Sequence, residues 1–267
     1  MENFKKASRI AFCAGLAGMV IPQFFYGTFG ANFFPPWPGL PWVAVWASLF
    51  TALILAACVA IVFEISARIV SLLLGGLLLA MYILGDIPYE LFVDPYKSHL
   101  GSWAELLKES ALAGGAFVIA GSFPAGPGSN RSTLIRALEK LIPFGPALFC
   151  ITMILYGYAH FLYTQFILTL VPHWIPGPTF WTLFAGVLLM ASGVAIILNI
   201  KRKIVAILLG VMITIWLFII HIPGAIADPL EKNANAPISA FSAVAFIGIA
   251  FLIAANAAKP GQTTGTK

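Results

Sequence analysis

The polar groups that could do chemistry are few in this chain, and most of them lie in or beside long apolar segments. The chain has four histidines, which are His99, His160, His173 and His221. His160 and His221 each fall in the outer part of an apolar segment. A neutral imidazole both donates and accepts a hydrogen bond, and it titrates near neutral pH. These two residues are therefore candidates for binding the carbonyl or hydroxyl group of a lipophilic ligand such as a quinone. The alternative is a hydrogen bond between helices that fixes their packing.

Two other histidine chemistries are less favoured by the sequence. Bis-histidine ligation of haem needs two facing rings, and a similar depth in the membrane does not establish that they face each other. A zinc site needs three or four ligands at helical or loop spacing, and the sequence has no HxxxH, HExxH or CxxC motif. We therefore predict no metal site, and we place haem behind quinone as a cofactor.

Two further sets of residues have both a functional and a structural interpretation. Asp86, Glu90, Asp94 and Glu109 gather around one external loop, where they could form a proton path or bind a cationic partner. The simpler interpretation is a solvated loop paired with lysines, with Glu109 near a helix start, where a carboxylate favours the helix dipole. The cysteines are Cys13, Cys58 and Cys150. We expect them to be small buried apolar side chains, and Cys13 and Cys150 could approach each other.

Tryptophans lie in and just after two proline-rich segments, FFPPWPGLPW and VPHWIPGP. Trp174 falls inside the second segment, and Trp46 and Trp181 follow the two segments. Tryptophan is enriched where a membrane meets water, so these residues are expected to be interfacial anchors. Alternatively, they shape the mouth of a ligand cavity, because aromatic rings give a large contact area.

Composition indicates the setting of these residues. The 267 residues are 60% hydrophobic and only 9% charged, whereas soluble domains carry about 25% charged residues. This excludes a cytosolic enzyme, a nucleic-acid-binding module and a disordered scaffold. The sequence also has no Walker motif, no GxGxxG and no nucleophile elbow.

The apolar runs are continuous and long enough for helices that cross a bilayer, which needs roughly 20 residues each. The sequence therefore predicts an all-α integral membrane protein with eight spans, near residues 10–29, 43–63, 69–85, 104–123, 144–166, 179–200, 204–221 and 238–257. The first run is too long for a cleaved signal peptide, so we interpret it as a retained span.

The basic residues predict the orientation of these spans. Eight spans place both termini on one side, and that side collects Lys5, Lys6, Arg9, Arg68, Arg131, Arg136, Lys140, Lys201, Arg202, Lys203, Lys259 and Lys267. Only Lys97, Lys108 and Lys232 fall on the other side. Because positive charge marks the cytoplasmic side, we predict cytoplasmic termini. The net charge of +5 then reflects topology and gives no reason to expect a nucleic-acid partner.

An internal repeat predicts the architecture. Residues 41–88 and 176–223 align without gaps at an offset of 135, with 15 identities in 48 positions. Four spans in each copy give both copies the same orientation, as in parallel repeats. We therefore predict two parallel four-helix repeats, with Gln23 in place of His160 and Asp86 in place of His221 in the first. The predicted units are the diverged first repeat (1–123), a cytoplasmic linker with one short helix (124–143), the second repeat (144–258) and a polar tail (259–267).

The second copy resembles the DoxX-like family of small four-helix membrane proteins. The similarity rests on Gly157, His160 and Phe161, on the segment Val171-Pro172-His173-Trp174-Ile175-Pro176, on Trp181 and Gly186, and on His221-Ile222-Pro223. It covers about 144–257 well and the first copy only weakly. The resemblance implies a bacterial inner-membrane protein associated with quinone-linked sulfur oxidation, oxidative-stress complexes or maturation of redox enzymes.

Three functions are consistent with these features. The favoured one is a membrane subunit or accessory of a quinone-linked redox system, with a redox partner subunit and a lipophilic ligand in the outer half of the bilayer. Its candidate ligand-binding residues are His160, His221, Trp181, Trp174, Gln23, Asp86 and Glu109. The alternatives are a small-molecule transporter or exporter and a non-enzymatic assembly or scaffold protein. The sequence specifies neither a catalytic residue nor an oligomeric state.

Overall fold

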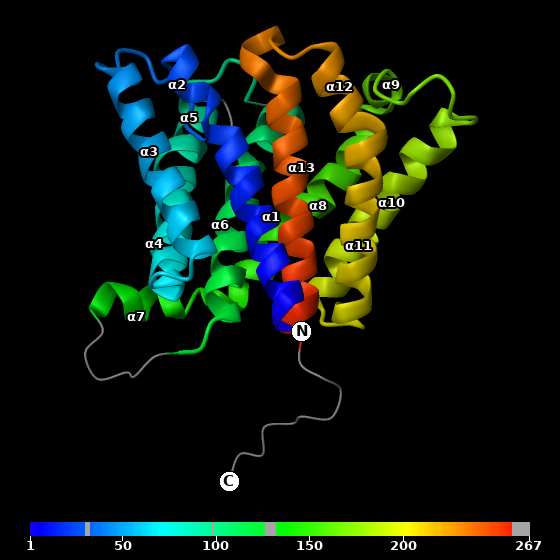
Figure 1. The fold of residues 1–267 in the computed structure, drawn as a ribbon. Helices are drawn as coiled ribbons and strands as arrows, with labels where there is room; N and C mark the ends of the chain where they lie inside the picture. Colours follow the sequence, from blue (N-terminus) through cyan, green and yellow to red (C-terminus); the bar gives the residue numbers. More distant parts are fainter. Residues whose placement is uncertain (30–32, 98, 126–131, 258–267) are drawn as a thin grey trace.

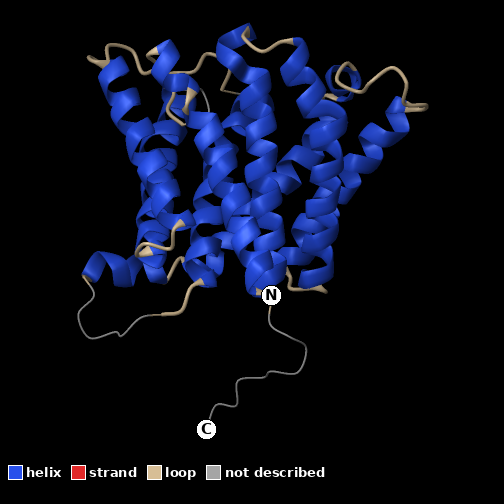
Figure 2. Cartoon of the chain, in the orientation of Figure 1, coloured by secondary structure: helices blue, strands red, loops and turns tan. Residues whose placement is uncertain are grey.

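The computed structural model describes residues 1–29, 33–97, 99–125 and 132–257, and within these ranges the chain is helical, with no strand (Figures 1 and 2). Its long helices are α1 (Glu2–Val20), α3 (Val43–Val62), α4 (Ala67–Met81), α6 (Leu100–Ser122), α8 (Gly145–Leu162), α10 (Pro178–Ile197), α11 (Arg202–Trp216) and α13 (Glu231–Asn256). Each of the eight predicted spans overlaps one of these helices. The all-helical prediction is therefore confirmed for the described residues.

Short elements connect or extend the long helices. They are α2 (Pro22–Tyr26), the π-helix η1 (Tyr82–Asp86), α5 (Ile87–Phe92), α7 (Thr133–Glu139), the 3₁₀-helix η2 (Ile142–Phe144), α9 (Thr164–Leu168), the π-helix η3 (Leu217–His221) and α12 (Ile222–Ala227). The short helix predicted inside the linker 124–143 is α7, which Ser132 caps by accepting a hydrogen bond of 3.3 Å from the Ile135 N–H. The predicted polar tail (259–267) lies outside the described residues.

Seven helical segments among the described residues are long and apolar enough to cross a membrane. They indicate a multi-pass membrane protein. The eighth long helix, α6, is not among them, because its first half carries Glu105, Lys108 and Glu109. Yet α6 is the most enclosed helix of its half of the molecule, since nearly every residue from Leu106 to Ser122 is buried.

The long helices pack as two groups, which we call lobe I (α1, α3, α4 and α6) and lobe II (α8, α10, α11 and α13) (Figure 1). In lobe I, α3 packs against α1 and α4, and α4 packs against α6. Lobe II repeats this pattern, with α10 against α8 and α11, and α11 against α13. The lobes meet through α1 against α13, α6 against α8, and α6 against α13. The first and last helices of each lobe therefore form the centre of the molecule.

Most elements of the two lobes have the same bounds after a shift of 135 residues. The shift carries α3 onto α10, α4 onto α11, η1 onto η3 and α5 onto α12. The N-cap residues match as well. The backbone is left-handed at both Trp42 and Gly177, and also at both Ser66 and Lys201. Since a π-helix is rare, its recurrence at the same repeat position is a specific similarity.

The predicted start of the first span, residue 10, was eight residues too late. Helix α1 begins at Glu2 and includes Arg9, which is only 2% exposed. The guanidinium donates to the Ser122 hydroxyl at 2.9 Å and to the Ser122 carbonyl at 3.2 Å, and it lies over the Phe123 ring. The sequence offered no sign of these partners, because Ser122 is more than a hundred residues away.

The start of α1, the end of α13 and α7 all lie on the same side of the molecule, at the bottom of Figure 1. Helix α7 is held there by Arg68, whose guanidinium pairs with Glu139 at 3.1 Å and donates to the Phe123 carbonyl at 2.9 Å. We call this the terminal face and the opposite end of the helices the outer face.

Candidate functional site

His160 is held in one orientation inside lobe II. Its Nδ1 lies 2.7 Å from the Tyr156 carbonyl oxygen one turn earlier in α8, and its ring stacks on Trp216 of α11 at 6.1 Å between centroids. A carbonyl only accepts, so Nδ1 must carry the proton, and Nε2 of the neutral ring is then an acceptor. His160 therefore offers a hydrogen-bond acceptor beside a flat aromatic surface.

The close contact between α8 and α10 fixes the position of His160. A Cβ on Gly157 would come within 2.6 Å of the Gly186 carbonyl oxygen, and a Cβ on Gly186 would come within 2.9 Å of the His160 Cβ. Only glycine permits this approach of the two backbones. The glycines quoted for the family resemblance thus position the histidine.

His221 follows Trp216 by five residues in the same run of helix. It ends η3, where the chain forms an i→i+5 turn and the Ile222 N–H donates to the Leu217 carbonyl. Such a turn is wider than a turn of an α-helix, so His221 points in a different direction than it would at the end of an α-helix. Among the described residues, His160 contacts Tyr156 and Trp216, and the structure shows no contact between the two histidines.

Helix α6 adds a charged pair to this region from the other lobe. Lys108 pairs with Glu105 one turn earlier, although Lys108 is buried. Lys108 acts electrostatically on His221, and Glu105 acts on Tyr156. The Tyr156 and Thr182 hydroxyl oxygens are buried and make no hydrogen bond. Lobe II thus contains two imidazoles and two unpartnered hydroxyls, and the ion pair of α6 acts on His221 and Tyr156.

Lobe I contains a different set of buried groups. Asp86 ends η1 and is 1% exposed, and Glu109 of α6 is 0% exposed. Their elements pack against each other, and their carboxyl groups are close enough to interact. The interpretation of these acids as a solvated loop paired with lysines is therefore wrong for both residues, since Lys108 pairs with Glu105 instead. The dipole interpretation of Glu109 is also wrong, because α6 begins nine residues earlier at Leu100.

Gln23 occupies the position in lobe I that His160 occupies in lobe II. Its side-chain oxygen accepts a hydrogen bond of 3.1 Å from the Thr51 hydroxyl, and its Nε2 is buried without an acceptor. Thr51 is the repeat equivalent of Gly186, so the polar residue faces the same point of the second helix in both lobes. The structure does not show direct contact between Gln23 and Asp86.

The tryptophans lie on the outside of the molecule. Trp174 is 70% exposed in the loop before α10, and Trp181 is 48% exposed and packs edge-on against Phe180 and Phe184. This placement suits interfacial anchors. In the described part of the chain, neither ring contacts His160 or His221, and the aromatic partner of His160 is Trp216.

The outer loops of the two lobes differ. In lobe I, the loop between α2 and α3 inserts Phe33, which is 1% exposed and packs on Phe50 of α3. In lobe II, no described residue between Tyr163 and Gly177 is buried, and α9 and its loop project sideways (Figure 1). Lobe I is thus filled from above by its own loop, and lobe II is not.

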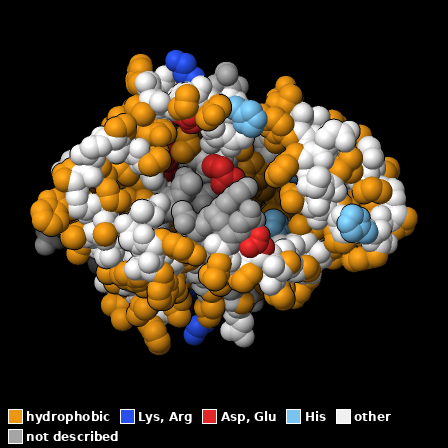
Figure 3. Space-filling view, turned by 90° about the horizontal axis from the view of Figure 1, so that it is seen from above, with side chains coloured by type: hydrophobic (Ala, Val, Ile, Leu, Met, Phe, Trp, Pro, Cys, Tyr) orange, Lys and Arg blue, Asp and Glu red, His pale blue; other side chains and the backbone are white. Residues whose placement is uncertain are grey.

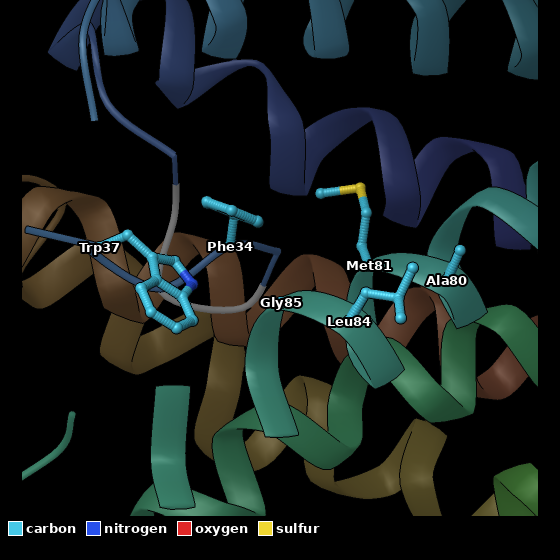
Figure 4. Close-up of a pocket in the computed structure, with 6 residues that line it drawn as sticks. All are labelled: Phe34, Trp37, Ala80, Met81, Leu84 and Gly85. Carbon is cyan, nitrogen blue, oxygen red and sulfur yellow. The ribbon is translucent and has the colours of Figure 1, made fainter. Parts of the chain in front are cut away.

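The outer face is hollowed near its middle, where acidic side chains gather (Figure 3). A separate shallow hollow of about 330 Å³ lies beside α4 and is lined by apolar side chains and Gly85 (Figure 4). Phe34 and Trp37 form one wall, and Ala80, Met81 and Leu84 form the other. None of the predicted site residues lines this hollow.

The cysteines follow the structural interpretation, because all three are buried. Cys13 contacts Cys58 on the neighbouring helix of lobe I, and no contact with Cys150 is recorded. In the described part of the chain, no three His, Cys, Asp or Glu side chains gather closely enough to hold a metal ion.

Sequence analysis missed three members of the lobe II site, Tyr156, Lys108 and Trp216. A signal existed for Tyr156, because it precedes His160 by four residues and so shares its helix face. Lys108 could not be assigned, since a helix predicted from sequence does not show which lobe each side faces. Trp216 could not be assigned either, because the sequence does not show that its ring stacks on His160 of another helix.

Comparison with known proteins gives one match. A family model described as a domain of unknown function (DUF8561) matches residues 149–258, which is the part of the chain that forms lobe II. No curated protein matches this chain, and no solved structure matches it. Lobe II, which carries both His160 and His221, is thus similar to a family whose function is not defined.

Proposed function

We propose that this chain is an inner-membrane protein of eight spans, built from two parallel four-helix repeats with cytoplasmic termini. The shared offset of 135 residues between the elements of lobes I and II supports the duplication. The position of both helix ends on the terminal face, together with the concentration of Lys and Arg there, supports the orientation. Helix α6 would be the eighth span, since Lys108 and Glu109 are buried against the other helices and Glu105 is paired with Lys108.

We further propose that lobe II binds a lipophilic ligand of the quinone class in the outer half of the bilayer, as part of a DoxX-like redox system. The observation that carries this proposal is the stacking of His160 on Trp216 with Nδ1 tied to a backbone carbonyl. Nε2 is then placed to accept from a ligand hydroxyl. The unpartnered Tyr156 and Thr182 hydroxyls can donate to a ligand carbonyl.

In this proposal, each residue has a defined part. Trp216 offers a flat face to the ring of the ligand, and His160 and His221 hold its oxygen atoms. A bound quinone would carry electrons and protons between the redox partner and the membrane pool. Imidazole suits the transfer of protons because it exchanges a proton near neutral pH.

The test is ligand analysis and binding in purified protein. Lipid extracts of protein isolated in mild detergent are examined by mass spectrometry for quinones, and a short-chain quinone is titrated while tryptophan fluorescence is recorded. Loss of one hydrogen bond of about 1.4 kcal/mol would weaken binding about tenfold, so His160→Ala and His221→Ala should each do so. His173→Ala is the matched control, because His173 is exposed on the loop. The proposal would be refuted if the extracts contained no quinone and both variants gave the wild-type titration. A visible absorption spectrum of the same sample tests for haem.

Transport of a small molecule is the second candidate, favoured by the duplication and by the buried carboxyl groups of lobe I. Repeats with a site at their interface are common in transporters. Uptake into proteoliposomes that depends on Asp86 but is insensitive to His160→Ala would favour this function over the first.

A further inference from the structure

Asp86 and Glu109 are fully enclosed acids that no cation neutralises. In the described part of the chain, all four of their carboxyl oxygens are buried and lack a hydrogen-bond donor. No ion pair of the described residues includes either acid. The element η1 packs against α6, and the two carboxyl groups are close enough for one of them, when protonated, to donate to the other.

This contact requires a proton. An ionised carboxylate only accepts hydrogen bonds, so two of them cannot bond to each other, whereas one protonated and one ionised group can. Two adjacent negative charges in an enclosed apolar setting also repel strongly, and carboxyl groups that share a site do not both ionise. The geometry is therefore that of two acids around one proton.

The surrounding elements do not supply an alternative partner. Both acids act electrostatically on Tyr82 of η1, and α5 contributes Glu90, another buried acid with one unpartnered oxygen. On α6 itself, the charged neighbours are Lys108 and Glu105, which pair with each other and act on lobe II. The groups that face the pair thus add negative charge or a neutral phenol.

We propose that Asp86 and Glu109 together form a proton-binding site inside lobe I, which takes up one proton between the two carboxyl groups and releases it when the pair ionises. The reaction is the binding of H⁺ to a carboxylate oxygen, without any other bond change. The same π-turn that presents Asp86 in lobe I presents His221 in lobe II. Each lobe therefore places an acid–base group at one point of the fold. This inference does not depend on a ligand in lobe II.

Infrared spectroscopy of the purified protein in lipid tests the site directly. The wild-type protein should show the C=O absorption of a protonated carboxyl group at mildly acidic pH, and this band should fade as the pH is raised. Asp86→Asn and Glu109→Gln should each remove or shift the band. Glu105→Gln is the matched control, because Glu105 lies on the same helix, is partly exposed and pairs with Lys108, and it should leave the band unchanged.

A second measurement serves if the variants do not fold. Dicyclohexylcarbodiimide modifies protonated carboxyl groups in apolar surroundings, so mass spectrometry of treated wild-type protein should find it on Asp86 or Glu109, with less labelling at alkaline pH. A wild-type protein with no such band and no labelling of either residue would overturn the inference. Quinone binding in the same sample would be unaffected, which separates this outcome from failure of the proposed function.

Discussion

Replacement of Arg9 by alanine should destabilise the protein far more than replacement of another basic residue of the terminal face. Arg9 is 2% exposed and joins α1 to the end of α6 through two hydrogen bonds to Ser122. Each hydrogen bond from a charged donor contributes about 1.5 kcal/mol or more. Stacking on Phe123 adds roughly 0.5–1 kcal/mol. The expected loss is therefore about 3–4 kcal/mol.

The ion pairs of Arg9 contribute little to this sum. Its partners Glu2 and Glu64 have side chains that are 68% and 49% exposed, and exposed pairs are worth about 0–1 kcal/mol. A loss of about 1 kcal/mol lowers the melting temperature of a protein of this size by roughly 2–4 °C. Arg9→Ala should thus lower it by about 6–16 °C. Glu2→Ala and Glu64→Ala should lower it by no more than about 4 °C each.

The assay is thermal unfolding in one detergent, followed by circular dichroism. Arg136→Ala is the control, because Arg136 is exposed and its guanidinium donates to the Thr133 hydroxyl within the same helix, α7. Arg9→Lys should recover part of the loss, since lysine keeps the charge but not the planar group that reaches Ser122 and stacks on a ring. A melting temperature for Arg9→Ala equal to that of Arg136→Ala, or one matched by Glu64→Ala, would refute the assignment to Ser122.

Three further predictions concern the packing and topology. Gly186→Ala should destabilise the protein by about 1–3 kcal/mol through overpacking, and it should weaken ligand binding because it moves His160. Gly224→Ala is the control and should have neither effect, because nothing lies near a Cβ at that position. Equal melting curves for the two variants would contradict the close approach of α8 and α10. Arg68→Ala should release α7 and speed tryptic cleavage at Arg136. Lys203→Ala should not, although Lys203 is the exposed repeat equivalent of Arg68. Cleavage of the Arg68→Ala variant at the wild-type rate would show that Arg68 does not hold α7. Reporter domains fused after Tyr96 and after Ser132 should lie on opposite sides of the membrane. If both reporters lie on the same side, α6 does not cross the membrane.

The sequence by itself determined the helices and their approximate limits. Continuous apolar runs are sufficient for this, because a backbone in lipid must satisfy its hydrogen bonds within a helix. The offset of 135 residues was also visible, and the same offset recurs in the bounds of α3, α4, α10 and α11. The sequence likewise marked His160, His221, Asp86 and Glu109 as polar groups in apolar surroundings.

Only the tertiary structure decided which of these groups meet. Adjacent residues of α6 face different lobes, so Glu109 contacts Asp86 whereas Lys108 acts on His221. Periodicity along one helix does not show which neighbour each side faces, because that depends on the packing of the other helices. Likewise, the π-turns rotate Asp86 and His221 away from the directions that an α-helix would give them. A π-turn amounts to one extra residue in a helical turn, and a hydrophobic pattern does not show where such a residue is inserted. The burial of Arg9 has the same origin, since its partner Ser122 comes near only when α1 and α6 pack together.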